Sequence, residues 1–500
     1  MLVCRGNAGD IDVLPERANT VLMLSVRPPI LPELDRQFIP AVLWNQTYRT
    51  LAARTAGARS ASLALEQPGG TVSVIPLNLL PESPDYTSLT MRYAERLVKF
   101  LLWQRGGSRL WIGGAPDVAA MLARQYAPGG EREFDDSLVA RKIFLEPLSV
   151  RSVPLLEMPL EHQPTVALGR HLKGCRIGFD LGGSDRKTSA VIDGRVVFTE
   201  EVPWNPYFQE DPNYHLEGIR HSLRRAAEHL PRVDAIGGSA AGTYVNNEVR
   251  AASLFRGISE ADFSRHVRGI FHTLQKEWPG VPFEVINDGE VTALAGSMSL
   301  GVNPVLGISM GTSTAAGYVD ANGHLTTWLN ELAFAPVDYH ADAPMDEWSK
   351  DRGCGVQYFS QQGAARLATT AGLVFPTLMP LAERLVEVQQ LLKSGDDRAA
   401  SIYRNIGTCF GYALAHYAEF MPLGNVLVLG RVTSGEGGEI ILAKARELLS
   451  AVFPNLSGVR LSMPDEQMKR HGQAVAAASL PPSGNQLDPG LAQSLPSRCP

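Results

Sequence analysis

The stretch from Arg176 to Gly194, RIGFDLGGSDRKTSAVIDG, constrains the fold of this chain more than any other. Its pattern predicts an apolar strand that ends at Asp180, a turn on Gly182, Gly183 and Ser184, and a second strand. Glycines let backbone N–H groups approach phosphate oxygens because no Cβ intervenes, and an acid at a strand end can hold a magnesium ion or its water. The bend therefore predicts a phosphate site with Asp180 near magnesium. A hairpin whose glycines serve only the turn is the alternative.

Four later segments favour the phosphate interpretation. They are a strand-end acid in FEVINDGEVTALAG, a second glycine and hydroxyl turn in GISMGTSTAAGYVDANG, a strand that ends in glycine before a helix in NVLVLGRVTSGEGGEIIL, and a closing helix in MKRHGQAVAAASL. In order and spacing, these segments resemble the ROK family of sugar kinases and regulators, in the actin, hexokinase and heat-shock-protein ATPase superfamily. The resemblance covers residues 173–481.

The resemblance implies an α/β protein with a two-lobed ribonuclease H-like (actin/hexokinase-type ATPase) fold and an additional N-terminal α/β domain. Lobe 1 is expected at 173–299 and lobe 2 at 300–464, and a C-terminal helix at 465–481 is expected to return to lobe 1. The sequence pattern itself predicts three strands in lobe 1, followed by helix, strand, helix, strand and helix. Lobe 2 is predicted to begin with VLGISMG, AAGYVD and a strand near LTTWLN.

The remaining segments resemble nothing familiar. Residues 1–24 are expected to be a flexible N-terminus, and the tail 482–500, rich in Pro, Ser and Gly, is expected to be disordered. Residues 25–164 mix strands and helices, among them a predicted hairpin around Pro68-Gly69-Gly70, and do not show a helix-turn-helix. A packing or oligomerisation domain and a lid or regulatory domain are both open interpretations of this part.

The composition is that of a soluble globular protein, with 44% apolar and 20% charged residues. A net charge of −6 and the absence of a Lys/Arg cluster argue against a nucleic-acid partner. No apolar run is long enough for a membrane helix, and the N-terminus does not resemble a signal peptide, so we expect a cytoplasmic protein with no membrane partner. The five cysteines are scattered, which predicts neither a disulfide framework nor a cysteine zinc site.

Asp288 is the candidate catalytic residue. It follows the apolar strand from Phe283 to Ile286 and precedes a predicted helix. The resemblance implies that this acid is the general base, which takes a proton from a sugar hydroxyl as the oxygen attacks the γ-phosphate of ATP. An Asp that merely caps the helix is the alternative.

The resemblance also implies ATP and Mg²⁺ as cofactors. Candidates on the nucleotide side are Asp180, Gly182, Gly183, Ser184, Gly311, Thr312, Ser313 and Gly430. The second turn could also be a plain hairpin, and Arg431 stands where the family typically has another glycine. Candidates for substrate binding are Asn287, Glu331, Gly242 and Asn246.

The sugar side departs from the family pattern. Glu331, in NELAF, keeps an acid that is expected to bridge sugar hydroxyls, although a surface acid is the alternative. Phe334 replaces a histidine that binds sugar and zinc in the family, and Val356 replaces a second acid. Of the cysteine-rich zinc motif only Cys354 remains, and one thiol cannot hold a tetrahedral zinc, so no zinc site is expected. The loop from Asp338 to Arg352 is then expected to be held by ordinary packing.

The sequence thus predicts an ATP-dependent, glucokinase-like carbohydrate kinase acting on a hexose or hexose derivative, with a homodimer as the expected assembly. One alternative is a catalytically silent sugar-sensing or regulatory protein, which the altered sugar motif suggests. The other is an ATPase of the same superfamily that acts on a partner enzyme. Those enzyme activators use paired cysteines around an iron–sulfur cluster, and no suitable pair is visible here.

Overall fold

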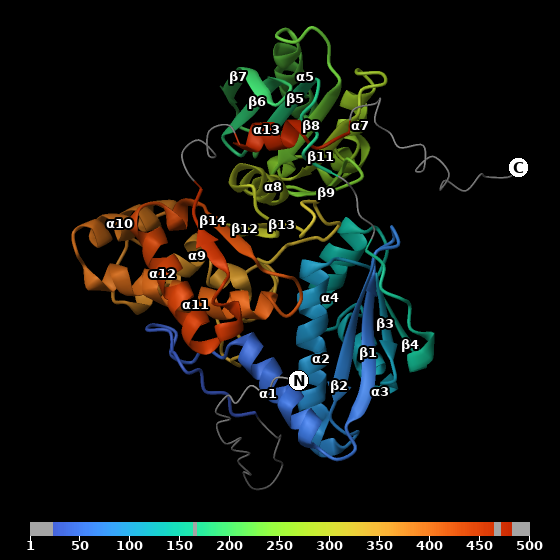
Figure 1. The fold of residues 1–500 in the computed structure, drawn as a ribbon, viewed down its shortest axis with the longest axis vertical. Helices are drawn as coiled ribbons and strands as arrows, with labels where there is room; N and C mark the ends of the chain where they lie inside the picture. The colour runs from blue at the N-terminus through green and yellow to red at the C-terminus, as the bar shows by residue number, and fades with distance from the viewer. Residues whose placement is uncertain (1–23, 164–167, 465–471, 483–500) are drawn as a thin grey trace, which may run out of the picture.

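A computed structural model describes residues 24–163, 168–464 and 472–482. An N-terminal part (24–163) lies beside lobe 2, and lobe 1 lies above both of them in the view of Figure 1. The expected flexible terminus and disordered tail fall outside the described residues, except for Leu24 and Pro482. None of the helices in the described ranges combines the length and apolar character needed to cross a bilayer.

The N-terminal part contains a four-stranded sheet with the order β2-β1-β3-β4. The hairpin predicted around Pro68-Gly69-Gly70 joins β1 to β2, β3 is antiparallel to β1, and β4 is parallel to β3. The strands are β1 (Arg59–Glu66), β2 (Val72–Leu79), β3 (Arg109–Gly113) and β4 (Ser149–Val153). The helices are α1 (Ala41–Arg54), α2 (Pro84–Gln104), α3 (Pro116–Gln125), α4 (Glu133–Asp135), the π-helix η1 (Asp136–Ile143) and the 3₁₀ turn η2 (Leu155–Glu157).

Lobe 1 contains a five-stranded sheet with the order β11-β8-β5-β6-β7. β5, β6 and β7 form an antiparallel meander, and β8 and β11 are parallel to β5. The strands are β5 (Cys175–Leu181), β6 (Asp185–Ile192), β7 (Arg195–Pro203), β8 (Ala235–Ala240) and β11 (Phe283–Asn287), with a small hairpin of β9 (Thr243–Val245) and β10 (Glu248–Ala251). The helical elements are α5 (Pro212–Ala227), η3 (Ser253–Phe255), α6 (Glu260–Asp262), η4 (Phe263–Val267), α7 (Ile270–Gln275) and α8 (Asp288–Leu300). This order and these directions confirm the predicted ribonuclease H-like fold.

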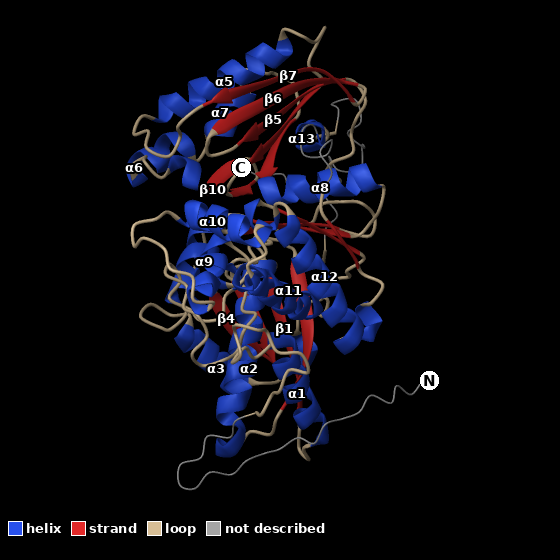
Figure 2. Ribbon diagram, turned by 90° about the vertical axis from the view of Figure 1, so that its left-hand side faces the viewer, coloured by secondary structure: helices blue, strands red, loops and turns tan. Residues whose placement is uncertain are grey.

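Lobe 2 repeats the plan on a smaller sheet with the order β13-β12-β14-β15. The strands are β12 (Val305–Met310), β13 (Thr314–Val319), β14 (Asn425–Leu429) and β15 (Arg460–Ser462). The helices are α9 (Gln361–Thr370), α10 (Leu381–Lys393), α11 (Asp397–Tyr417) and α12 (Glu436–Val452), with 3₁₀ turns η5 (Gly355–Gln357), η6 (Arg431–Thr433) and η7 (Pro454–Leu456). Helix α8 lies between the two sheets (Figure 2).

The prediction of a strand near LTTWLN is wrong. Only an isolated bridge between Val319 and Leu325 remains of it. The next residues donate their backbone N–H groups to the end of α2 instead: Leu329 to the carbonyl oxygen of Arg105, and Glu331 to that of Trp103 at 2.9 Å. The hydrogen bonds that a strand would need are therefore made with the N-terminal part.

The described part of the closing helix, α13 (Gln473–Ala478), packs on the lobe 1 sheet. Two strand glycines permit this close approach, because a Cβ on Gly178 would lie 2.1 Å from the carbonyl oxygen of Ala474 and a Cβ on Gly237 only 1.7 Å from that of Ala477. The guanidinium of Arg176 also donates to the Ala478 carbonyl oxygen at 3.0 Å. The chain after lobe 2 thus returns to lobe 1.

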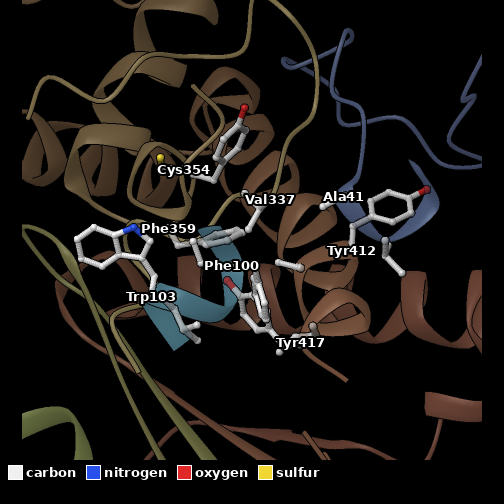
Figure 3. Packing of buried hydrophobic residues seen from close by; sticks show 14 of the residues in the cluster. Ala41, Phe100, Trp103, Val337, Cys354, Phe359, Tyr412 and Tyr417 are labelled. Atoms are coloured by element: carbon white, nitrogen blue, oxygen red, sulfur yellow. The ribbon is translucent and has the colours of Figure 1, made fainter. Parts of the chain in front are cut away.

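The N-terminal part and lobe 2 have a common hydrophobic core, whereas lobe 1 has a core of its own. Figure 3 shows Phe100 and Trp103 of α2 among side chains of lobe 2. The ring of Phe100 stacks on Tyr417 with centroids 5.9 Å apart, and the ring of Trp103 lies 4.4 Å from that of Phe334. The N-terminal part has its own sheet but buries its longest helix against the second lobe.

Candidate functional site

Three polar residues lie at one edge of the lobe 1 sheet. Asp180 near the end of β5 is in register with Ser239 of β8, and Ser239 is in register with Ile286 of β11, two residues before Asp288. The hydroxyl of Ser239 donates to Asp180 Oδ1 at 2.6 Å. Because ligands of such sheets collect beyond the carboxyl ends of the strands, this edge is where a site is expected.

Asp288 begins α8 and is not its cap residue, although Asp288 Oδ1 also accepts from the Gly289 N–H at 2.9 Å. The cap is Asn287, whose Oδ1 accepts from the Gly289 N–H at 2.7 Å and whose Nδ2 donates to the Gly242 carbonyl oxygen at 2.7 Å. The side chain of Asn287 is thereby occupied within the protein. Its role is to fix the start of α8 and to hold the loop at Gly242 beside it.

Both carboxylates at this edge have raised pKa values. Burial, and after it the negative charge of Asp180, raises the pKa of Asp288 to about 6. Burial also raises the pKa of Asp180, although the hydrogen bond from Ser239 and the charge of Lys187 oppose this. A carboxylate with a pKa near 6 is mostly ionised at neutral pH yet basic enough to accept a proton.

Two glutamates complete a carboxylate cluster, which we define as Asp180, Asp288, Glu290 and Glu331. Burial, followed by the charge of Asp288, raises the pKa of Glu331 to about 7. Burial, followed by a smaller charge effect of Glu331, raises the pKa of Glu290 to about 8. Glu331 comes from lobe 2, so the cluster joins the two lobes.

Sequence reasoning missed Glu290. In the sequence it looks like an ordinary acid in the first turn of a helix, where the positive end of the helix dipole stabilises acidic side chains. The signal that was available is that α8 is otherwise made of apolar and small residues, which makes a glutamate two residues after Asp288 unusual.

The turn between β5 and β6 offers unpaired backbone donors. Among the described residues, none accepts a hydrogen bond from the N–H groups of Gly183 or Ser184, whereas the Gly182 N–H donates to the Asp185 carbonyl oxygen at 3.0 Å. Successive free N–H groups in a turn attract anions. Across the strand pair, Lys187 lies opposite Asp180 and was also missed from the sequence.

Tyr207 closes over this turn. A Cβ added to Gly183 would lie 1.9 Å from the Tyr207 hydroxyl, so no larger residue fits at Gly183 while that ring is in place. Arg256 in turn lies over the ring of Tyr207 at 4.3 Å. A larger residue at this position would therefore have to displace the Tyr207 ring.

The second turn lies at the matching edge of lobe 2. Of the described residues, none accepts a hydrogen bond from the N–H groups of Thr312 or Ser313, and both residues are exposed. Gly311 begins this turn directly after β12. Gly430, after β14, has φ 105°, and a Cβ there would lie 2.5 Å from the Met310 carbonyl oxygen. The two strand ends of lobe 2 thus meet at these glycines.

Close backbone packing joins this second turn to Asp288. A Cβ on Gly289 would lie 2.6 Å from the Ala316 carbonyl oxygen, and a Cβ on Gly317 would lie 2.3 Å from the Gly289 carbonyl oxygen. The start of α8 therefore rests directly on β13, the strand that follows the turn. Asp288 therefore lies at the junction between the lobes, beside the strand that follows the lobe 2 turn.

Asn246 does not join this junction. It forms the exposed turn of the β9–β10 hairpin with φ 53°. Its neighbour Asn247 bonds to β11, accepting from the Val285 N–H at 2.7 Å. The hairpin contacts the carboxylate cluster through Thr243 instead, whose hydroxyl donates to Glu331 Oε1 at 3.4 Å.

The position of the family's zinc histidine is filled by aromatic packing. Phe334 lies 4.4 Å from Trp103, 6.0 Å from Phe134 and 5.6 Å from Trp348. The remaining thiol, Cys354, is buried, and this burial raises its pKa to about 12. Throughout the described ranges, no group of three or more His, Cys, Asp or Glu residues has an arrangement suited to a metal ion.

Ordinary packing is only part of what holds the loop from 338 to 352. Asp351, near its end, lies 3.0 Å from Arg96, 3.0 Å from Lys99 and 2.8 Å from Arg132. Burial alone would raise the pKa of Asp351, but these three charges hold it well below its usual range. Buried ion pairs with the N-terminal part therefore fix this loop, which the sequence expectation did not include.

No protein-family model matches the chain, and no curated protein matches it. Among solved structures, it is similar to a ROK hexokinase from Thermus thermophilus, with 20% identity over 61% of this chain and 98% of that chain and a TM-score of 0.48. A ROK family glucokinase from Streptomyces griseus in complex with glucose and AMPPNP has 21% identity, 61% and 98% coverage and a TM-score of 0.45. A ROK family transcriptional regulator, homologous to the E. coli MLC protein, has 17% identity, 62% and 79% coverage and a TM-score of 0.49. These solved structures are what the chain is similar to.

Proposed function

We propose that this protein is an ATP-dependent carbohydrate kinase that transfers the γ-phosphate to a hydroxyl of a hexose or hexose derivative. One observation carries the proposal: Asp288, with a pKa raised to about 6, follows the lobe 1 strand end near Asp180 and begins a helix that packs on β13, the strand after the lobe 2 turn. Among the described residues, none accepts a hydrogen bond from the N–H groups of Gly183, Ser184, Thr312 or Ser313 in the turns of the two lobes. Phosphoryl transfer requires positioning and charge neutralisation more than covalent catalysis, which suits amide-rich turns and a single base.

Asp288 is the proposed general base. At neutral pH its carboxylate accepts the proton of the attacking sugar hydroxyl. Its place at the start of α8 is fixed by Asn287, which caps that helix. The backbone N–H groups of Gly183, Ser184, Thr312 and Ser313 are proposed to bind phosphate oxygens of ATP, and Gly430 is proposed to lie on the adenosine side.

Asp180 fits a magnesium ion chemically. Carboxylate oxygens are the ligands that Mg²⁺ prefers, and the charge of Asp180 that raises the pKa of Asp288 is the kind of repulsion that a divalent cation relieves. Magnesium would neutralise phosphate charge when bound. Asp180 would hold it directly or through water, with Ser239 orienting the carboxylate.

Glu331 and Glu290 are proposed to bind sugar hydroxyls. Both carboxyls have pKa values raised by burial, to about 7 and about 8. Glu290 is thus mostly protonated at neutral pH and can donate a hydrogen bond, whereas Glu331 can accept one or donate one. This pair is proposed to replace the histidine and the second acid of the family pattern.

The direct test is a coupled assay of ATP consumption across hexoses, N-acetylhexosamines and sugar alcohols. Turnover that requires a sugar and is lost in Asp288→Asn supports the kinase. Turnover without sugar supports an ATPase that acts on a partner, and sugar binding without turnover supports a sensor. Light scattering during the same purification tests the expected homodimer.

The sensor is the second candidate, because Phe334 lies in an aromatic cluster and offers no hydrogen bond to a sugar. Calorimetric titration with the same sugars separates the two. A sugar that binds while ATP remains unconsumed over prolonged incubation would favour the sensor.

A further inference from the structure

A cavity of about 580 Å³ lies where the N-terminal part meets lobe 2. One wall consists of α2 and the chain shortly after α3, and the other consists of the two ends of the loop from 338 to 352. No residue of the carboxylate cluster lines it. Its volume falls within the range of small-molecule sites, about 300–1,000 Å³.

Three cations that line this cavity lack an acidic partner. Within the described part of the chain, neither Arg92 nor Lys350 nor Arg352 forms an ion pair. Arg92 donates to the carbonyl oxygen of Tyr339, and Arg352 donates to that of Ala343 at 3.0 Å. Burial, and then the charge of Arg96, lowers the pKa of Arg92, and the charges of Glu95 and Asp338 offset this only in part.

The two buried acids of the cavity wall are already neutralised. Asp351 lies between Arg96 and Arg132, and Glu95 forms ion pairs with the same two arginines at 2.6 Å each. Although burial alone would raise it, the charges of Arg96 and Arg132 lower the pKa of Glu95. Among the described residues, these two acids thus form their ion pairs with other cations and none with Arg92, Lys350 or Arg352.

The third acid is occupied by hydrogen bonds. Asp338 accepts from the Tyr358 hydroxyl at 2.6 Å and from the His340 N–H at 2.8 Å. Glu131 is the fourth acid in the wall, and it is exposed. The charge that faces the cavity without a partner is therefore mainly positive.

We propose that this cavity is a binding site for a phosphorylated small molecule, whose phosphate is bound by Arg92, Lys350 and Arg352. A guanidinium binds phosphate with two parallel hydrogen bonds, and a lysine ammonium adds a point charge. The ion pairs of Asp351 and Glu95 in the cavity wall fix the surrounding backbone, so the protein loses little conformational entropy when the ligand binds. Nothing in this inference depends on the proposed kinase activity.

Isothermal titration calorimetry of the full-length protein with inorganic phosphate, glucose 6-phosphate and ADP, each alone, tests this site. At least one probe should bind, and Arg92→Ala and Arg352→Ala should each weaken that binding on the order of tenfold or more, since each removes charge-assisted hydrogen bonds. Arg54→Ala is the matched control, because Arg54 is an exposed arginine on α1 and should leave the affinity unchanged. The probe that binds most tightly shows whether the site prefers free phosphate, a sugar phosphate or a nucleotide.

The same probes could bind the turns of the proposed kinase cleft, and a further variant distinguishes the two places. Thr312→Asp adds a negative charge to the exposed lobe 2 turn and should repel phosphate only there. Binding that persists in Thr312→Asp and falls in the arginine variants supports the cavity. The opposite pattern, no binding of any probe, or full affinity in Arg352→Ala overturns the proposal. Arg352 is exposed, so its variant is expected to fold even if Arg92→Ala does not.

Discussion

At the scale of single residues, the surroundings of Asp288 lower the stability of the fold but favour its proposed activity. Its carboxylate is partly buried beside another carboxylate, which is unfavourable for folding but produces the pKa of about 6 that a base requires. Strained or repulsive arrangements of this kind are common in functional sites and are offset elsewhere in the fold.

We therefore expect Asp288→Asn to lower sugar phosphorylation by about 10²–10⁴-fold while stabilising the fold at neutral pH. The raised pKa means that the folded state binds the proton more tightly, so the wild type loses stability as pH rises from the usual carboxyl pKa through about 6. The variant should be more stable by on the order of 1–3 kcal/mol at pH 8 and nearly equal near pH 4. Urea denaturation at both pH values checks this, and equal stability at pH 8 would contradict it.

The same pKa predicts the pH dependence of catalysis. Since the base must be ionised, kcat/KM for the sugar should fall about tenfold per pH unit below about pH 6. Initial rates between about pH 5 and pH 8 measure this limb. Glu331→Gln should raise KM and leave the limb in place, because Asp288 remains. If the fall in kcat/KM at low pH disappears in Glu331→Gln, the titrating group is Glu331 and not Asp288.

Gly183 gives a steric prediction. Gly183→Ala would place its Cβ 1.9 Å from the Tyr207 hydroxyl, so either the ring or the phosphate turn must move. We expect KM for ATP to rise by about tenfold or more, in line with the loss of one or two charge-assisted hydrogen bonds. Gly183→Ala combined with Tyr207→Ala should recover much of the affinity, as steady-state kinetics would show. No recovery would mean that the glycine is needed for another reason.

At the scale of elements, the sequence predicted those strands and turns whose signal lies within their own residues. The β5–β6 hairpin, the hairpin around Pro68-Gly69-Gly70 and the strand before Asp288 were predicted because alternation and glycine turns are local signals. The stretch around LTTWLN was predicted wrongly because its partner is the end of α2, far away in the sequence. Glu290, Lys187 and Tyr207 were missed for the same reason, since only the folded chain brings them to the site.

Buried ion pairs with the N-terminal part hold the loop from 338 to 352 in place. Asp351 pairs with three cations in a nearly water-free place, and removing one partner of a buried ion pair leaves uncompensated charge. Asp351→Asn should therefore destabilise the protein by about 3–5 kcal/mol. Chemical denaturation measures the loss. The control is Glu447→Gln, which breaks the exposed pair with Lys444 and should cost about 0.5 kcal/mol or less. Similar effects of both changes would mean that the buried cluster does not stabilise the loop.

At the scale of the whole molecule, the common core decides which parts can exist alone. The N-terminal part has the sheet and helices of an independent domain, which is what its sequence predicted. Its core, however, continues into lobe 2 through Phe100, Trp103 and the aromatic residues that they contact. Lobe 1, by contrast, keeps a separate core and meets lobe 2 through α8. Motion between the lobes is therefore expected at α8, while the N-terminal part moves with lobe 2.

A chain that begins at residue 165 tests this division. Deleting the N-terminal part would expose the faces of Tyr417 and Phe334 that α2 covers and would remove the carbonyl oxygen of Trp103 that binds the Glu331 N–H. Exposed apolar surface of this kind leads to aggregation. We expect the shortened chain to be insoluble or to bind a hydrophobic dye, and co-expression with residues 25–164 to restore a soluble complex. A monodisperse shortened chain with unchanged thermal stability would show that lobe 2 does not need the N-terminal part, and sugar binding by that chain would show that Glu331 is positioned without α2.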